Sequence, residues 1–228
     1  MKLEKITEES RRRYEDACGT AHALEILGER WALLIMRELM LGPKRFGDIR
    51  TSLPGISANV LTQRLEGLEK SGVLRRRKLP PPASVQVYEL TEWGRDAEGI
   101  IKTMGFWAAR SPNHDPTLPL SPVSLLLSFR TMFGADEARD ERVTLEFRFG
   151  EEVFTCRVAA GELINGRGEA DAPDAVIAGT PEPVAAVVYG GVDPDELVWS
   201  GALKIDGDVE ALRRFAGFFE LPEKAATT

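Results

Sequence analysis

A proline-rich segment at residues 111–122 constrains the fold of this 228-residue chain more than any other feature. The segment reads SPNHDPTLPLSP and contains Pro112, Pro116, Pro119 and Pro122. Because proline fixes φ and lacks an N–H donor, this segment should form neither a helix nor an inner strand. A chain of this length has room for one or two domains. We therefore expect two modules, residues 1–110 and 123–228, joined by a linker.

The two halves of the chain carry opposite net charge. Residues 1–110 contain 19 Lys and Arg against 15 Asp and Glu, which is a net charge of +4. Residues 111–228 contain 10 Lys and Arg against 21 Asp and Glu, which is a net charge of −11. Such an asymmetry suggests different partners for the two modules. The basic half could contact nucleic acid, although the whole chain has a net charge of −7.

The composition is typical of a globular protein, with 43% hydrophobic and 29% charged residues. No apolar run reaches the roughly 18 residues that a membrane span needs. The first sixteen residues, MKLEKITEESRRRYED, lack the apolar stretch of a secretory signal. We therefore expect a cytoplasmic protein without membrane contact.

The first module begins with a helical pattern over residues 21–41. Apolar residues recur there at three- and four-residue steps, the period of a buried helix face. They are Leu24, Leu27, Trp31, Leu34 and Ile35. Gly28 should divide the segment into two helices, and Gly42 and Pro43 should end the second. A third, short helix is expected over residues 44–53.

The next helix, expected over residues 57–71, presents two different faces. Ser57 can cap its N-terminus by accepting a backbone N–H. A projection at 100° per residue places on the inner stripe Leu61, Leu65 and Leu68. The polar face near the N-terminus contains Asn59, Thr62 and Gln63. Asn and Gln can pair with the major-groove edge of adenine, and Thr can serve several bases, so this face could read DNA. The alternative is a set of exposed amides.

Two extended segments follow this helix, residues 73–79 and 85–90, with a turn at 80–84 between them. Their cations are Arg75, Arg76, Arg77 and Lys78. Because side chains alternate along a strand, about half of these cations could reach phosphate. The alternative is a solvated face. Arg64 projects beside the core edge and could contact either a phosphate or a carboxylate.

A final helix of this module, capped by Thr91, is expected over residues 91–110. The resulting order of helices, turn and hairpin is that of a winged helix-turn-helix. The blocks LGERWALLIMREL, GPKRFGDIRTSLPGIS, VLTQRLEGLEKSG and YELTEWG resemble HxlR-type transcriptional regulators, relatives of the MarR group. The resemblance covers residues 14–110. It implies a bacterial homodimer that binds double-stranded operator DNA and dimerises through its first and last helices.

By the same resemblance, the helix over 57–71 is the recognition helix and residues 73–90 form the wing. The DNA-binding candidates are Lys44, Arg45, Ser57, Asn59, Thr62, Gln63, Arg64, Arg75, Arg76, Arg77 and Lys78.

Cys18 lies just before the first core helix. Several HxlR-type regulators use a cysteine there to sense oxidants or electrophiles, so Cys18 is a redox-sensing candidate by resemblance. A helix N-terminus stabilises a thiolate, whereas the neighbouring Glu15 and Asp16 oppose it. The alternative is a small buried apolar residue. Cys156 is expected in the core.

The second module is expected to be α+β. Residues 143–149 alternate apolar and polar side chains, which predicts a strand with one solvated face. A hairpin, three further short strands and helices capped by Thr180 and Asp208 follow. The ending GALKIDGDVEALRRFAGFF resembles the sterol-carrier-protein-type domain, which implies an apolar tunnel for a hydrophobic effector. The alternative is a solid core that only widens the dimer.

The sequence offers little for catalysis. Its two histidines, His22 and His114, lie near no nucleophile motif, and the two cysteines stand too far apart for a zinc site. Asp206, Asp208 and Glu210 resemble the start of a calcium loop whose later ligands are missing. We therefore expect no enzyme activity, cofactor or metal. The alternative to a regulator is a lipid-carrier-like binding protein whose helical half serves dimerisation or protein docking.

Overall fold

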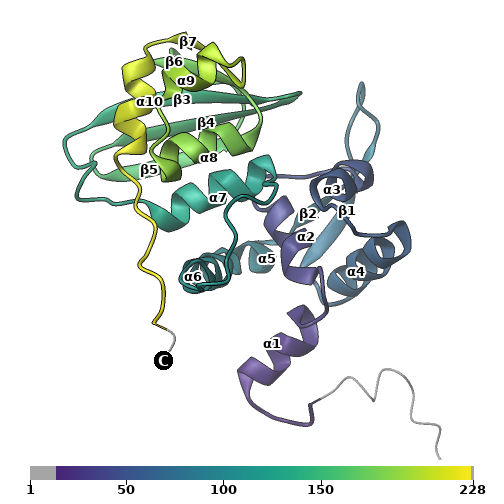
Figure 1. The fold of residues 1–228 in the computed structure, drawn as a ribbon. Helices are drawn as coiled ribbons and strands as arrows, with labels where there is room; N and C mark the ends of the chain where they lie inside the picture. The colour runs from purple at the N-terminus through teal and green to yellow at the C-terminus, as the bar shows by residue number, and fades with distance from the viewer. Residues whose placement is uncertain (1–13, 227–228) are drawn as a thin grey trace, which may run out of the picture. The chain divides into compact units, whose positions relative to one another are not determined.

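The computed structural model of the chain describes residues 14–226. Most of the charged N-terminal segment, for which we expected no secretory signal, lies outside these residues. Contacts divide the chain into two compact units, Met1–Ala97 and Glu98–Thr228. Figure 1 shows the elements of both units.

The first unit has the predicted winged helix-turn-helix order of elements. They are α1 (Gly19–Leu27), α2 (Ala32–Leu39), α3 (Phe46–Ser52), α4 (Ala58–Lys70), β1 (Leu74–Lys78), β2 (Gln86–Leu90) and α5 (Glu92–Asp96). The α4 helix folds as its sequence predicts. The hydroxyl of Ser57 accepts the N–H of Val60 at 3.3 Å, and the inner stripe of Leu61, Leu65 and Leu68 is buried.

The expected apolar stripe of residues 21–41 is wrong in part. The chain does divide after Gly28, but Leu24 and Leu34 are exposed and α1 buries no residue. The backbone turns sharply at Trp31, whose φ is 81°. Residues on either side of this turn no longer share one helix face, so only Ile35 of the predicted stripe is fully buried.

The two strands of the first unit pair as an antiparallel hairpin, which confirms the predicted wing. Its register places Leu74 opposite Leu90 and Lys78 opposite Gln86. The loop that joins the strands extends beyond α3 (Figure 1). Tyr88 of β2 also bridges to the backbone of Lys44, which fixes the hairpin to the start of α3.

The helix expected over 91–110 forms as two helices. Thr91 caps α5 as predicted and accepts the N–H of Gly94 at 3.0 Å. A break at Ala97 separates α5 from α6 (Glu98–Ala109). The α6 helix packs on α7 (Pro122–Met132) and therefore belongs to the second compact unit, whereas the sequence placed it in the first module.

The second unit contains a five-stranded sheet with the strand order β5-β4-β3-β6-β7. Its remaining elements are β3 (Arg142–Phe149), β4 (Glu152–Ala159), β5 (Glu162–Arg167), β6 (Ala175–Gly179), α8 (Pro181–Gly190), α9 (Pro194–Trp199), β7 (Leu203–Gly207) and α10 (Val209–Ala216). The β3 and β6 strands are parallel, and all other pairs are antiparallel. Helices α7, α8 and α10 lie against one face of the sheet (Figure 1).

Aromatic rings fill the space between this sheet and its helices. The ring of Phe129 is fully buried and lies 5.1 Å from that of Phe219 and 5.3 Å from that of Phe215, measured between centroids. Phe147 and Tyr189 complete the cluster at 6.0 and 6.3 Å. The place where the sterol-carrier resemblance implied a tunnel is thus occupied by packed side chains.

The helix caps and buried positions of the second unit agree with the sequence only in part. The cap of α10 is confirmed, since Asp208 accepts the N–H of Glu210 at 3.0 Å, and Cys156 is buried as predicted. Thr180 occupies the N-cap position of α8 but makes no side-chain cap bond there. The prediction of a solvated face on β3 is wrong at Glu146. This side chain is buried, and its carboxylate accepts the N–H of Ala170 at 2.8 Å and the Nε of Arg148 at 2.7 Å.

Candidate nucleic-acid interface

The exposed face of α4 is the centre of the candidate interface. Asn59, Thr62 and Gln63 all lie on the surface. They do so because the three leucines on the opposite side of the helix are buried against the first unit's core. A helix held on one side and polar on the other can present amide and hydroxyl groups to base edges.

Arg64 is fixed by the turn between α1 and α2. Its guanidinium donates to the Glu29 carboxylate at 2.6 Å and to the carbonyl of Arg30 at 3.1 Å. Of the two roles that the sequence left open, the structure shows the pairing with a carboxylate. Arg64 therefore holds the recognition-helix candidate to the rest of the unit.

Successive arginines of the wing pair with carboxylates on opposite sides of β1. Arg75 and Arg77 both donate to Glu89 of β2, at 2.7 and 2.9 Å. Arg76 points to the other side and donates to Glu69 at the end of α4, at 2.8 Å. Lys78 forms no ion pair within residues 14–226. All four side chains are exposed, on both sides of the strand.

These pairs shift the titration of both carboxylates. The hydrogen bond from Arg76 lowers the pKa of Glu69, and hydrogen bonds from Arg77 and Arg75 lower the pKa of Glu89 despite partial burial. Both groups are therefore anionic at neutral pH. The wing is a compact set of cations that is already partly neutralised by its own acids.

At the start of α3, one predicted DNA-binding residue is buried, and one further cation is exposed. Lys44 is only 3% exposed because its ammonium donates to Glu38 and to Ser52, both at 2.9 Å. It therefore does not lie on the candidate surface. Arg45 is exposed as expected, and so is Arg50 on the same helix, which sequence reasoning missed. The sequence could have indicated this residue. In the block KRFGDIR, Arg50 follows the buried Ile49 directly and therefore does not lie on the buried face of α3.

Cys18 occupies the N-cap position of α1 and is exposed. Its own N–H donates to Asp16 at 2.9 Å. The backbone N–H groups of Thr20 and Ala21 at the start of α1 lower the pKa of the Cys18 thiol. This helix-terminal environment favours the thiolate, and the exposure of Cys18 does not fit the alternative of a buried apolar residue.

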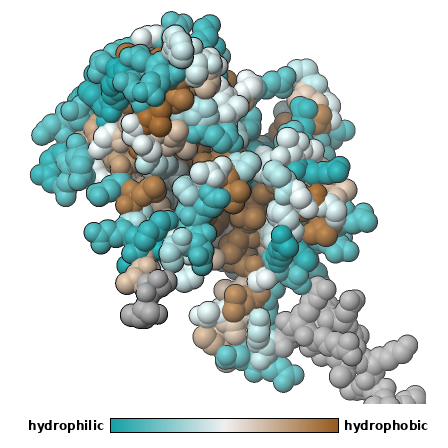
Figure 2. Space-filling view, in the orientation of Figure 1, coloured by the Kyte–Doolittle hydropathy of each residue, from teal (hydrophilic) through white to brown (hydrophobic). Residues whose placement is uncertain are grey.

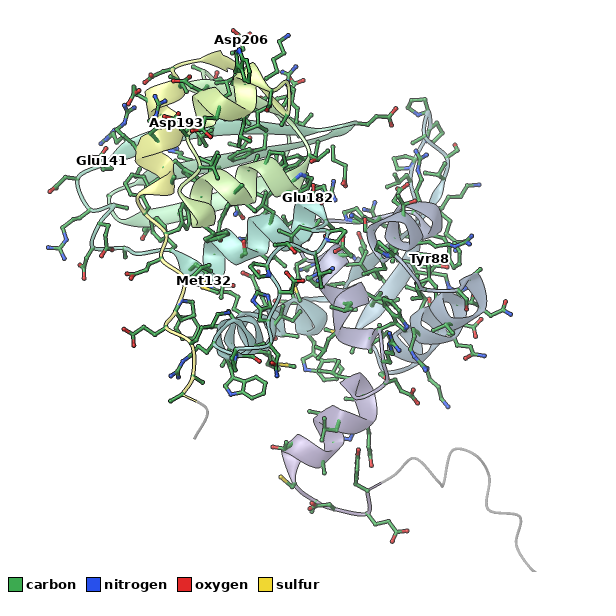
Figure 3. All side chains as sticks on the ribbon, in the orientation of Figure 1. Tyr88, Met132, Glu141, Glu182, Asp193 and Asp206 are labelled. Atoms are coloured by element: carbon green, nitrogen blue, oxygen red, sulfur yellow. The ribbon has the colours of Figure 1, made fainter. Side chains whose placement is uncertain are left out.

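Tyr88, labelled in Figure 3, marks the β2 strand directly opposite Arg76. The first unit thus combines an exposed amide face on α4, a cationic hairpin and the exposed Arg45 and Arg50 of α3 and its N-cap. Within residues 14–226, no group of three or more His, Cys, Asp and Glu side chains could hold a metal ion. No helix in the same range is both long and apolar enough to span a membrane.

The two halves of the chain are similar to different families of known proteins. Residues 26–115 match the family described as HxlR-like helix-turn-helix. The HTH-type transcriptional regulator YodB of Bacillus subtilis is 40% identical over 86 residues, which are 38% of this chain and 77% of that protein. The reduced form of YodB is also similar, with 35% identity, a TM-score of 0.39, and coverage of 44% of this chain and all of that one.

The second half matches another family. Residues 120–225 match the family described as Alkyl sulfatase C-terminal, rather than the sterol-carrier family that the sequence ending suggested. A solved structure, the inverting sec-alkylsulfatase Pisa1 from Pseudomonas sp., is 20% identical with a TM-score of 0.42. The match covers 44% of this chain and 16% of that one.

Proposed function

Because the chain belongs to the HxlR-like helix-turn-helix family of transcriptional regulators, we propose that it binds double-stranded operator DNA as a homodimer. The observation that carries this proposal is the combination of an exposed Asn59, Thr62 and Gln63 face on α4 with the cationic β1–β2 hairpin that follows it. The amides would read bases in the major groove, and the wing would contact phosphates.

Exposed apolar side chains on α6 and α1 support the homodimer. On α6, Ile100, Met104 and Trp107 are spaced by one helical turn each, and Trp107 is 73% exposed. On α1, which buries no residue, Leu24 is exposed, and hydrophobic atoms lie on the surface of that helix in Figure 2. Helices with this pattern commonly bury the stripe against a partner helix.

The test of DNA binding begins with selection of bound fragments from genomic DNA, followed by affinity measurements at several salt concentrations. For every phosphate contact, log K should fall by about 0.9 per unit of log salt. Gln63→Ala should cost roughly 1–3 kcal/mol on the selected site and relax its sequence preference. Arg76→Ala should weaken specific and random DNA alike and flatten the salt dependence.

A duplex that binds with no preference for any selected sequence, and no difference between these two variants, would contradict the proposal. Tight binding of an apolar ligand with no duplex binding would instead favour the lipid-carrier alternative. The packed aromatic interior of the second unit does not favour that alternative.

We further propose that Cys18 makes DNA binding sensitive to oxidants or electrophiles. Its exposure and the lowered pKa of its thiol support this role. The experiment compares operator release by a quinone or hydrogen peroxide in the native chain and in Cys18→Ser. Unchanged release in the variant would exclude Cys18 as the sensor, and because Cys156 is buried, Cys156→Ser is the matched control.

A further inference from the structure

A groove of about 430 Å³ lies on the second unit between α6, α7 and β5. Its lining consists of Glu98, Lys102, Arg130, Phe133, Leu163, Ile164 and Asn165. Met132, labelled in Figure 3, marks the end of α7 beside which Arg130 and Phe133 lie. The volume falls within the range of small-molecule sites. Because rings fill the interior of this unit, the groove is the better candidate for a ligand.

The lining has an apolar side and a cationic side. Phe133 and Leu163 form the apolar side. Ile164 alternates with Leu163 and Asn165 along β5, so its side chain lies on the other face of the sheet. Lys102 and Arg130 form the cationic side. Lys102 makes no ion pair within residues 14–226. This gathering is unusual for the unit, in which acids outnumber bases by 22 to 12 over residues 98–228.

Arg130 is held in place independently of its carboxylate partner. Its Nε donates to the Oδ1 of Asn165 at 2.6 Å, and another guanidinium nitrogen donates to the Asn165 carbonyl at 2.6 Å. Asn165 is 5% exposed and donates in turn to the carbonyl of Leu126 at 2.7 Å. The remaining Arg130 nitrogen donates to both oxygens of Glu98, at 2.9 and 2.8 Å.

Glu98 thus pairs with a guanidinium whose orientation is fixed by other residues. A carboxylate of a bound ligand could accept the same two hydrogen bonds and replace Glu98. The second cation, Lys102, has no carboxylate of its own to exchange. We propose that this groove binds an aliphatic carboxylate: the head group pairs with Arg130 and Lys102, and the chain covers Phe133 and Leu163.

This site also connects the ligand to α6. Glu98 is the first residue of that helix, so an incoming carboxylate that displaces it releases the helix from Arg130. Since α6 carries the stripe of the proposed dimer, the ligand would change operator affinity. This consequence rests on the proposed function, whereas the binding of the carboxylate itself does not.

The test is calorimetric titration of the full chain with decanoate below its micelle concentration, with decanol and decyltrimethylammonium as probes of the same chain length. Saturable binding of decanoate alone is expected. Lys102→Met should weaken it roughly tenfold, whereas Lys204→Met, an exposed cation on β7, should leave it unchanged. Leu163→Ser should also weaken binding, whereas Ile164→Ser on the other face of β5 should not. Glu98→Gln should strengthen binding because the competing carboxylate is lost.

No saturable binding, equal binding of decanol, or equal effects of Lys102→Met and Lys204→Met would each overturn the proposed site. Circular dichroism of each variant checks that the fold is retained. Decanoate that binds at the groove but leaves operator affinity unchanged would overturn the connection to α6 and leave the site itself standing.

Discussion

At the scale of single residues, the carboxylates beside the wing matter as much as its cations. Glu89 pairs with Arg75 and Arg77, and Glu69 pairs with Arg76. Exposed pairs of this kind contribute little to stability. Their larger effect is on binding, because a DNA phosphate must compete with a carboxylate that already occupies each arginine.

Removing these acids should therefore strengthen non-specific DNA binding. We expect Glu69→Gln and Glu89→Gln to raise affinity for random duplex and to steepen the salt dependence by about 0.9 for each additional phosphate contact. Salt titrations on random and selected DNA measure both effects. Glu92→Gln on α5 is the control, since it makes the same change in net charge outside the wing. An equal effect of all three variants would contradict this role.

The same carboxylates make the wing sensitive to acid. The pKa of Glu89 is lowered in the folded state by Arg77 and Arg75. A carboxylate with a lowered folded pKa contributes stability above its unfolded pKa of about 4.3, and this is lost as the pH falls through the folded value. Amide exchange in β1 and β2, corrected for intrinsic rates, should show progressive opening below that pH. Glu89→Gln should remove most of this dependence.

At the scale of elements, the junction between the hairpin and α5 depends on one glycine. Gly94 is buried, and a Cβ at this position would lie 2.0 Å from the backbone carbonyl oxygen of Val73. Gly94→Ala should lower the free energy of unfolding by roughly 1–3 kcal/mol, as overpacking does. Urea denaturation measures the change.

Gly67 on α4 is the matched control, because a Cβ there would meet no atom within 4 Å. Gly67→Ala should raise the free energy of unfolding by up to about 1 kcal/mol through helix propensity. Equal changes in both variants would show that Gly94 is not sterically required.

The exposed stripe on α6 should determine the oligomeric state. Met104→Glu and Trp107→Glu place a charge on the proposed dimer surface, where burying it without a partner is costly. We expect a shift from dimer to monomer in analytical ultracentrifugation. Trp199→Glu on α9 is the control, because Trp199 is 92% exposed and lies outside this stripe. A dimer that survives both α6 substitutions would place the interface elsewhere.

At the scale of the whole molecule, a two-fold dimer predicts a symmetric operator. Two recognition helices related by such an axis contact half-sites about 34 Å apart, or a multiple of that distance. Hydroxyl-radical footprinting should show two equivalent protected regions on the selected DNA. The Trp107→Glu variant should protect them only at higher concentration. A single asymmetric region in the native chain would contradict the two-fold arrangement.

Much of the fold is predictable because it follows from local patterns. The leucine spacing of α4, the caps at Ser57 and Asp208, and the hairpin of β3 and β4 are all found where the sequence places them. Helix period, strand alternation and capping each involve residues only a few positions apart. The amide face of α4 follows from the same helix period, since it lies on the side of the helix opposite the buried leucines.

Local patterns were thus enough to predict the winged helix-turn-helix order and the α+β second unit, and they supplied a list of candidate cations near the recognition-helix candidate. Tertiary structure decided which of those cations are available. Arg64 is taken by Glu29, 35 positions away, and Lys44 is buried against Glu38 and Ser52. It also decided that phenylalanine rings close the interior of the second unit. These outcomes depend on which distant side chains meet in three dimensions, and a local pattern carries no information about such contacts.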